Sequence, residues 1–422
     1  MLLDRFKPRS RYAYRFFISL YETYWARSTY NPPPGVHGVE HRRTSGAAVN
    51  MTDYGRRLPI DPTGGEVVAP YTAVGLIPTV RGIRRREDIA INIEHLRHLV
   101  KAAAWLSGLS IPVRLIAVPE GALQAFNDEV LDLDHVAFAR ECAIDIPGRE
   151  TDALGELARE YDVFVMAQAK ARHPELPDRF FNVGFVLDPA GEVILRHYKV
   201  SPLFPVEHSV CPHDVYDWWV ERYGAGLDAF WPVVDTEIGR LGIMMANEGS
   251  YPENARGLAM NGAEVVYRGP YPHPHVGNGL FEVQNRARAL DNNFYLIACN
   301  VGTYYLHTDS DVPIDTFGGG SAVIDYRGQI VGRHDYSAGS SWVAGTIDVE
   351  ALRKFRASAQ WDNWIKDLTT EQYQLIYEEP IYPKNLYLDR APYTHAEYRR
   401  EVIDRQIELM HERDVWRRPD KG

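Results

Sequence analysis

The feature that most constrains the fold is a regular alternation of apolar and amphipathic segments that begins at Tyr71. The run YTAVGLIPTV is apolar enough for a buried strand, and REDIAINIEHLRHLVKAAAWLSGL follows it with apolar residues at helical spacing. Further segments alternate in the same way: VRLIAVP, TDALGELAREY, DVFVMAQA, the hairpin strands NVGFVLD and EVILRHY, RLGIMMA, YPENARGLAMNG, AEVVYR, LFEVQNRARALDNN, FYLIACN and the hairpin SAVIDYRGQIVGRHD. This order predicts a layered α/β fold.

Composition and the pattern of predicted elements divide the chain into three parts. Residues 1–70 are rich in Tyr, Arg, Pro and Gly, and we expect an N-terminal extension that packs against the body or a partner subunit. Residues 71–348 carry the alternation and form the main predicted domain. Residues 349–422, rich in Tyr and Glu, are expected to form a C-terminal tail that wraps a partner subunit.

Charge and cysteine content narrow the class of protein. The formal net charge of -11 argues against nucleic acid as a partner, because such binding depends on clustered Lys and Arg. No apolar run reaches the length of a membrane span, so we expect no membrane partner. The three cysteines form no CxxC pair, which favours a reducing, cytoplasmic location. No pattern indicates a cofactor.

Three charged residues lie at or just beyond the ends of predicted strands, where a sheet opens toward a cleft. Glu120 closes RLIAVPE, and Lys199 ends EVILRHYK. Glu207 follows Lys199 by eight residues, in a loop that two prolines stiffen. Taken singly, each has an ordinary explanation: Glu120 suits a helix N-terminus, and Lys199 suits an exposed hairpin. Together they indicate a charged site.

The junction ANEGSYPE, residues 246–253, is a further candidate. Here an apolar strand breaks into a turn and then a helix with Pro252 near its start. Such a corner exposes a nucleophile, and its backbone N–H groups can stabilise a developing negative charge. The residue at this corner is Ala246, which has no reactive atom.

These motifs resemble the nitrilase superfamily of carbon-nitrogen hydrolases. VPEG, RHYKVSP and GIMMANEGSYPENARGLAMNGAEVVYR are similar to its three signature regions, in the same order. The second glutamate, eight residues beyond the lysine, makes the resemblance nearest to aliphatic amidases and formamidases. It implies a four-layer α-β-β-α sandwich and a homodimer or larger homo-oligomer. It also implies a cysteine six residues before Pro252, where this chain has Ala246.

The resemblance implies a role for each site residue in the hydrolysis of a small-molecule carboxamide to a carboxylate and ammonia. A cysteine at position 246 would attack the amide carbon and form an acyl-enzyme. Glu120 would act as general base, Lys199 and the Asn247 N–H would stabilise the oxyanion, and Glu207 would accept from the substrate amide. Gly121 replaces an aromatic residue, which would enlarge the pocket. The candidate substrate-binding residues are Asn247, Tyr251, Gly121, Arg268 and His273.

Other interpretations remain open at this level. The run EHSVCPHD offers metal ligands in Glu207, His208, Cys211, His213 and Asp214, but its spacing matches no familiar zinc pattern, so we expect no metal. A nitrilase or an N-carbamoyl amide hydrolase would carry similar motifs. The chain with Ala246 is either an inactive Cys-to-Ala variant or a natural pseudoenzyme that binds an amide without turnover. The retained charges favour the former, because burying them without catalysis is costly.

Overall fold

The computed structural model describes residues 67–336 and 338–420, apart from the side chains of residues 177, 273 and 274. The predicted N-terminal extension therefore lies outside the described residues, except for residues 67–70. From Tyr71 onward, strands and helices alternate as the sequence predicts.

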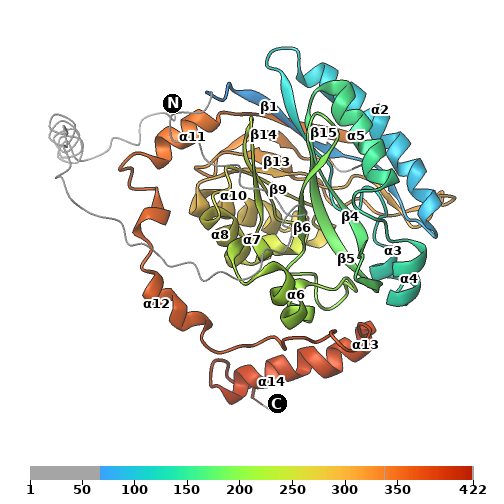
Figure 1. Ribbon diagram of the computed structural model, residues 1–422, viewed down its shortest axis with the longest axis vertical. Coiled ribbons are helices and arrows are strands. Elements are labelled where there is room, and N and C mark those ends of the chain that lie inside the picture. Colours follow the sequence, from blue (N-terminus) through green and yellow to red (C-terminus); the bar gives the residue numbers. More distant parts are fainter. Residues whose placement is uncertain (1–66, 337, 421–422) are drawn as a thin grey trace, which may run out of the picture. The chain divides into compact units, whose positions relative to one another are not determined.

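The first of two six-stranded sheets has the strand order β15-β1-β3-β4-β5-β6 (Figure 1). Its strands are β1 (Tyr71–Ile77), β3 (Val113–Ala117), β4 (Phe164–His173), β5 (Leu176–Leu187), β6 (Val193–Tyr198) and β15 (Ser341–Ile347). β1, β3 and β4 are parallel, and the predicted hairpin of β5 and β6 is confirmed. β15 was not predicted; it pairs antiparallel with β1 across most of the chain length.

The second sheet has the strand order β14-β13-β10-β9-β8-β7. Its strands are β7 (Val233–Thr236), β8 (Gly239–Ile243), β9 (Val265–Arg268), β10 (Tyr295–Ala298), β13 (Ser321–Ile324) and β14 (Ile330–His334). β8, β9 and β10 are parallel, so their carboxyl ends share one edge. β8 ends at Ile243, three residues earlier than its predicted end, because the chain turns toward the corner at Ala246.

The two sheets stack face to face and helices cover their outer faces, which confirms the predicted α-β-β-α sandwich (Figure 1). Apolar residues of both sheets form the inner core, such as Leu115 and Met166 of the first with Ile243 and Ile297 of the second. Helices α2 (Ile89–Ser107) and α5 (Arg149–Tyr161) contribute to the core on the outer face of the first sheet. Helices α8 (Pro252–Met260) and α10 (Leu280–Asn292) do so on the second.

A three-stranded sheet that the sequence did not predict lies beside the sandwich. It consists of β12 (Pro313–Asp315), β11 (Tyr304–Tyr305) and β2 (Val80–Arg81). These strands are too short to show a periodicity of their own. The sheet matters for function because Tyr304, Ile314 and Asp315 line a cavity of about 790 Å³.

The C-terminal segment begins with α11 (Val349–Arg356), whose Val349 and Leu352 are buried in the inner core. The chain continues through α12 (Thr370–Gln374), α13 (His395–Tyr398) and α14 (Asp404–Glu412). His395 of α13 reaches the cavity, where its Nε2 donates to the Val206 carbonyl over 2.9 Å. In the described part of the chain, no helix has both the length and the apolar character needed to cross a membrane.

Candidate active site

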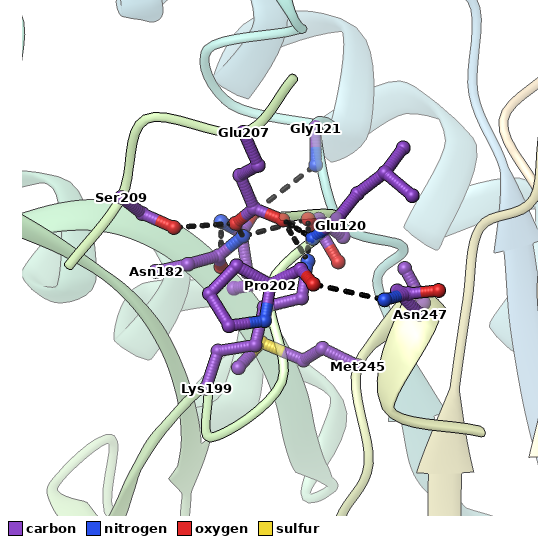
Figure 2. A network of polar contacts seen from close by, with 12 residues as sticks. Glu120, Gly121, Asn182, Lys199, Pro202, Glu207, Ser209, Met245 and Asn247 are labelled. Carbon is purple, nitrogen blue, oxygen red and sulfur yellow. Dashed lines mark hydrogen bonds and ion pairs between the residues drawn. The ribbon is translucent and has the colours of Figure 1, made fainter. Parts of the chain in front are cut away.

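Glu120, Lys199 and Glu207 meet at one point, although Glu120 follows β3 and the other two lie in the loop after β6 (Figure 2). Lys199 follows β6, and its Nζ donates to Glu120 Oε1 over 2.9 Å and to Glu207 Oε2 over 2.8 Å. All three side chains are at least nine-tenths buried. A lysine held between two carboxylates in a low-dielectric site is preorganised to stabilise a negative charge that develops beside it.

Asn182 of β5 joins the two carboxylates and was not predicted. Its Nδ2 donates to Glu120 Oε1 over 2.7 Å and to Glu207 Oε1 over 2.9 Å. Gln168 holds its amide in this orientation, because Gln168 Nε2 donates to Asn182 Oδ1 while Gln168 Oε1 accepts from the Gly121 N–H. The signal available in the sequence was a single amide in each of two short apolar runs, VFVMAQA and NVGFVL.

Glu207 has its hydrogen-bonding capacity filled. Oε1 accepts from Asn182 and Ser209, and Oε2 accepts from Lys199 and the Leu203 N–H. Burial alone would raise the pKa of Glu207, but Lys199 and the hydroxyl and amide donors lower it to about 2. Glu207 is therefore ionised, and it has no acceptor position left for a ligand.

Glu120 differs from Glu207 in the hydrogen bonding of one carboxylate oxygen. Its Oε2 is buried and has no hydrogen-bond partner among the described residues. Burial and the nearby Glu207 raise the pKa of Glu120, while Lys199 and Asn182 oppose that rise. Its backbone N–H donates to the Tyr267 hydroxyl over 2.6 Å, which fixes the loop against the second sheet. A carboxyl with a raised pKa and one free oxygen suits proton transfer.

Lys199 stays protonated in this site. Burial alone would lower its pKa, but Glu120 and Glu207 raise it above its usual value. An ammonium group has three donors, and the two carboxylates take two of them. The third donor can serve a ligand, because Lys199 lines the cavity.

Ala246 lies beside this cluster in a strained backbone conformation, with φ at +33°. A non-glycine residue in this region costs about 1–3 kcal/mol and persists only where its surroundings enforce it. Here the Ala246 N–H donates to the Gly269 carbonyl over 3.1 Å, and the Ala246 carbonyl accepts from Arg268 Nε over 3.1 Å. The chain therefore maintains an elbow at a residue that carries only a methyl group.

Glu248, which the sequence did not single out, ties this corner to the Lys199 loop. Its carboxylate accepts from the Met245 N–H over 2.6 Å and from the Val200 N–H over 2.7 Å, and it also contacts His197. The side chain is fully buried. Because one carboxylate holds both segments, the positions of Ala246 and Lys199 depend on each other.

A cavity of about 790 Å³ opens above the cluster. Glu120, Lys199, Glu207, Ala246 and Asn247 all line it. The rest of its wall is largely apolar: Phe126, Val130, Leu203, Val206, Pro270, Pro272, Leu306, Ile314 and Phe317. This composition is typical of a small-molecule site, in which a few polar groups stand in a mainly apolar wall.

The other candidate substrate-binding residues have different positions. Tyr251 and Gly121 do not line the cavity, and Arg268 is buried behind Ala246, where it supports the backbone. The side chain of His273 lies outside the described residues, whereas the nearby His275 lines the cavity. The sequence could not separate these two histidines, because both belong to the same His-Pro repeat.

Gly121 is constrained by an aromatic ring. It has φ at +82°, and a Cβ at this position would come within 2.2 Å of the Phe126 ring. The Phe126 ring thus occupies part of the space that a side chain at position 121 would fill, and Phe126 itself lines the cavity. A glycine at this position therefore enlarges the pocket less than the sequence suggested.

The family of the chain follows from comparison with known proteins. Residues 73–357 match the Carbon-nitrogen hydrolase family. The chain belongs to this family. It is similar to a formamidase of Helicobacter acinonychis, with 25% identity over 72% of this chain and 88% of the relative. A Bacillus cereus formamidase is 28% identical over 57% of this chain and 66% of the relative.

The fold of this carbon-nitrogen hydrolase also matches solved structures. A carbon-nitrogen hydrolase from Helicobacter pylori G27 superposes with a TM-score of 0.52 at 18% identity, over 74% of this chain and 99% of the other. At this level of identity the match concerns the fold alone. It supports the nitrilase-superfamily sandwich that the signature motifs imply.

The run EHSVCPHD does not form one ligand set in this carbon-nitrogen hydrolase. Glu207 binds Lys199, whereas the Asp214 carboxylate accepts from the Cys211 N–H. His208 instead lies with Asp132 and His395, their ligand atoms within 4.8 Å of one another. Two of these residues have hydrogen bonds that explain their positions without a metal. The His395 backbone N–H donates to the Asp132 carboxylate, and the His395 ring donates to the Val206 carbonyl.

The lowered pKa of Glu207 predicts how stability depends on pH. Its folded pKa of about 2 lies below the usual 4.5, so its contribution is complete above about pH 4.5 and is lost as the pH falls through 2. Glu207→Gln is therefore expected to lower the free energy of unfolding by about 3 kcal/mol at pH 7 but only about 1 kcal/mol at pH 3. Urea unfolding at both pH values measures this.

The exposed Glu192 provides the control for loss of a charge. Glu192→Gln should change the free energy of unfolding by less than about 0.5 kcal/mol at either pH. An equal destabilisation by Glu207→Gln at pH 7 and pH 3 would contradict the assignment of an ionised, hydrogen-bonded carboxylate.

Proposed function

We propose that this chain has the site of an amidase that hydrolyses small-molecule carboxamides, and that Ala246 leaves it able to bind such an amide without turnover. One observation carries the proposal: Lys199, clamped by Glu120 and Glu207, lines a cavity beside a strained elbow at position 246. The formamidase relatives support the same class of bond.

With a cysteine at position 246, the residues present would serve each step. Glu120 takes the thiol proton through Oε2, and the thiolate attacks the amide carbon. The oxyanion lies between the third donor of Lys199 and the Asn247 N–H, which has no helical partner in the first turn of a short 3-10 helix (Ala246–Ser250).

The tetrahedral intermediate then expels ammonia, which receives the proton from Glu120. Glu120 next takes a proton from water, and the resulting hydroxide attacks the thioester. The acid departs as the thiolate regains its proton. Each proton thus passes through one carboxyl group, which is the group with a free oxygen and a raised pKa.

We assign Glu207 the role of positioning Lys199, in place of the substrate contact that the resemblance implied. Its four hydrogen bonds leave no free acceptor for an amide NH₂. The free Oε2 of Glu120 is the acceptor that such an amide would meet. Glu207 keeps Lys199 charged and directed at the cavity.

No other thiol takes the place of the missing one. Cys142, Cys211 and Cys299 are buried, and none lines the cavity. Burial raises the pKa of each thiol, to about 12 for Cys142. Because the thiolate is the reactive form, these cysteines are inert as nucleophiles.

Ala246→Cys is expected to create hydrolysis that releases ammonia from a carboxamide. The added Sγ would point into the cavity, because Ala246 already lines it. The variant is assayed for ammonia with a panel of carboxamides, nitriles and N-carbamoyl compounds. Ala246→Ser controls for size, and it should stay much slower because an alcohol is far less acidic than a thiol.

The panel also separates the alternatives. Ammonia from nitriles alone would favour a nitrilase, and release of carbon dioxide with ammonia would favour an N-carbamoyl amide hydrolase. Binding of a carboxamide by the Ala246 chain, with no turnover after Ala246→Cys, would favour a pseudoenzyme. No binding and no hydrolysis of any compound would refute the proposal.

A further inference from the structure

A second charged cluster lies beside the same cavity, and the hydrolytic mechanism does not use it. Lys170 of β4 places its Nζ against Asp128 and 2.9 Å from Glu129 Oε1. Both acids belong to α3 (Asn127–Val130). The side chains of Lys170 and Asp128 are only 1% exposed, so these two groups form a closed ion pair behind the cavity wall.

Glu129 is the member of this cluster that faces the cavity. Its side chain is 14% exposed, and it lines the same space as Glu120 and Ala246. Lys170 engages Oε1, and among the described residues no donor meets Oε2. A carboxylate anchored through one oxygen, with the other available, is a preorganised acceptor for a ligand.

The remaining charges of the cavity indicate which kind of ligand group suits Glu129. Of the described residues that line it, four are carboxylates and Lys199 alone is a lysine or arginine. Lys199 binds Glu120 and Glu207 through two of its donors, and the proposed reaction uses the third for the oxyanion. The cavity therefore has no free lysine or arginine for a substrate carboxylate, whereas Glu129 can receive a cation.

Much of the remaining cavity wall is apolar. Val130, Leu203, Val206 and Phe317 line the cavity together with Glu129. Such walls suit a chain of methylene groups, each of which gains about 0.8 kcal/mol on burial. A volume of about 790 Å³ far exceeds what formamide needs.

The geometry points to Glu129 as a subsite for the terminal ammonium group of an amino-carboxamide substrate. In this arrangement the amide lies at Ala246 and Lys199, the methylene chain follows the apolar walls, and the ammonium group pairs with Glu129 Oε2. The inference rests on the proposed amidase function and names its substrate class.

The protonation of Glu129 supplies an independent signature. Burial raises the pKa of Glu129 to about 8, so this carboxyl is largely neutral at pH 7. An ammonium group would bind the ionised form and replace the proton. The charged and titratable groups that act on it are Asp128 on α3, Lys170 on β4, Lys199 and Glu207 after β6, and Tyr304 on β11. Binding at pH 7 should therefore release a proton from the site.

The test uses the full chain with Ala246 and two matched ligand series. One series consists of straight-chain carboxamides with a terminal ammonium group, and in the other a methyl group replaces the ammonium group. Titration calorimetry in two buffers of different ionisation enthalpy gives the affinity and the number of protons released. We expect one chain length of the ammonium series to bind about tenfold to a hundredfold tighter than its methyl counterpart, with proton release.

Two substitutions at Glu129 separate recognition from a structural role. Glu129→Gln should remove the preference and the proton release while affinity for the methyl series stays the same. Glu129→Asp should shift the preferred ammonium ligand to one methylene longer, because its carboxylate is one methylene shorter. Glu141→Gln, on the exposed end of α4 (His135–Glu141), controls for the change in net charge and should alter neither.

The outcomes distinguish this inference from the proposed function. If Ala246→Cys hydrolyses both series equally and Glu129→Gln leaves their ratio unchanged, the amidase proposal holds and the Glu129 subsite is refuted. If no carboxamide binds but a simple alkylamine binds and is lost in Glu129→Gln, the subsite holds and the amidase proposal fails. Equal affinity for both series, or a preference for the methyl series, would also refute the assignment.

Discussion

In a chain carrying Ala246→Cys, the further substitution Glu120→Gln is expected to lower kcat by about 10³–10⁴-fold, at the upper end of what a single acid-base group contributes. Glu120 is the carboxyl with a buried oxygen free of hydrogen bonds and with a raised pKa. Every proton transfer of the proposed reaction passes through it. Glutamine has nearly the same shape but cannot take a proton. Steady-state ammonia release measures the change.

Measurements of carboxamide affinity distinguish a variant that has lost catalysis from one that has lost the binding site. Glu120→Gln in the Ala246 chain should still bind a carboxamide, weaker by no more than about tenfold for the one lost acceptor, because Lys199 remains paired with Glu207. A matched Glu207→Gln in the Ala246→Cys chain should lower kcat less, since Glu207 acts only by holding Lys199. A larger loss from Glu207→Gln than from Glu120→Gln would overturn this division of roles.

Lys199→Met is expected to lower the free energy of unfolding by about 3–5 kcal/mol. The side chain is 2% exposed, and its Nζ is the cation shared by Glu120 and Glu207. Methionine preserves much of the volume but leaves two buried carboxyls without a countercharge. An uncompensated buried charge is costly, and part of the cost should appear as proton uptake by these carboxyls. Urea unfolding at pH 7 gives the magnitude.

Two comparisons test the physical reason for this loss. Lys101→Met on the exposed face of α2 should change stability by less than about 0.5 kcal/mol. Adding Glu207→Gln to Lys199→Met should recover part of the stability, because it removes one of the unpaired acids. If the double variant is less stable by the sum of the two single losses, the coupling inferred from the geometry is absent.

Much of the architecture could be predicted because it depends on local periodicity. The alternation from Tyr71 onward located most strands and helices, and the nitrilase-type motifs implied the two-sheet sandwich. β15 escaped prediction because its pairing with β1 joins residues such as Ile347 and Tyr71. The small sheet of β2, β11 and β12 escaped because strands of two or three residues show no period.

The sequence by itself determined which residues come together: Glu120, Lys199, Glu207 and the corner at 246 all lie at strand ends or turns that local patterns reveal. Only the tertiary structure decided which of their oxygens is free. Asn182 lies 62 residues from Glu120 and 25 from Glu207, yet it bonds both. Likewise Glu129 reaches the cavity because Lys170, from another element, anchors it. Hydrogen-bond partners depend on distances across packed layers, and chain spacing does not contain those distances.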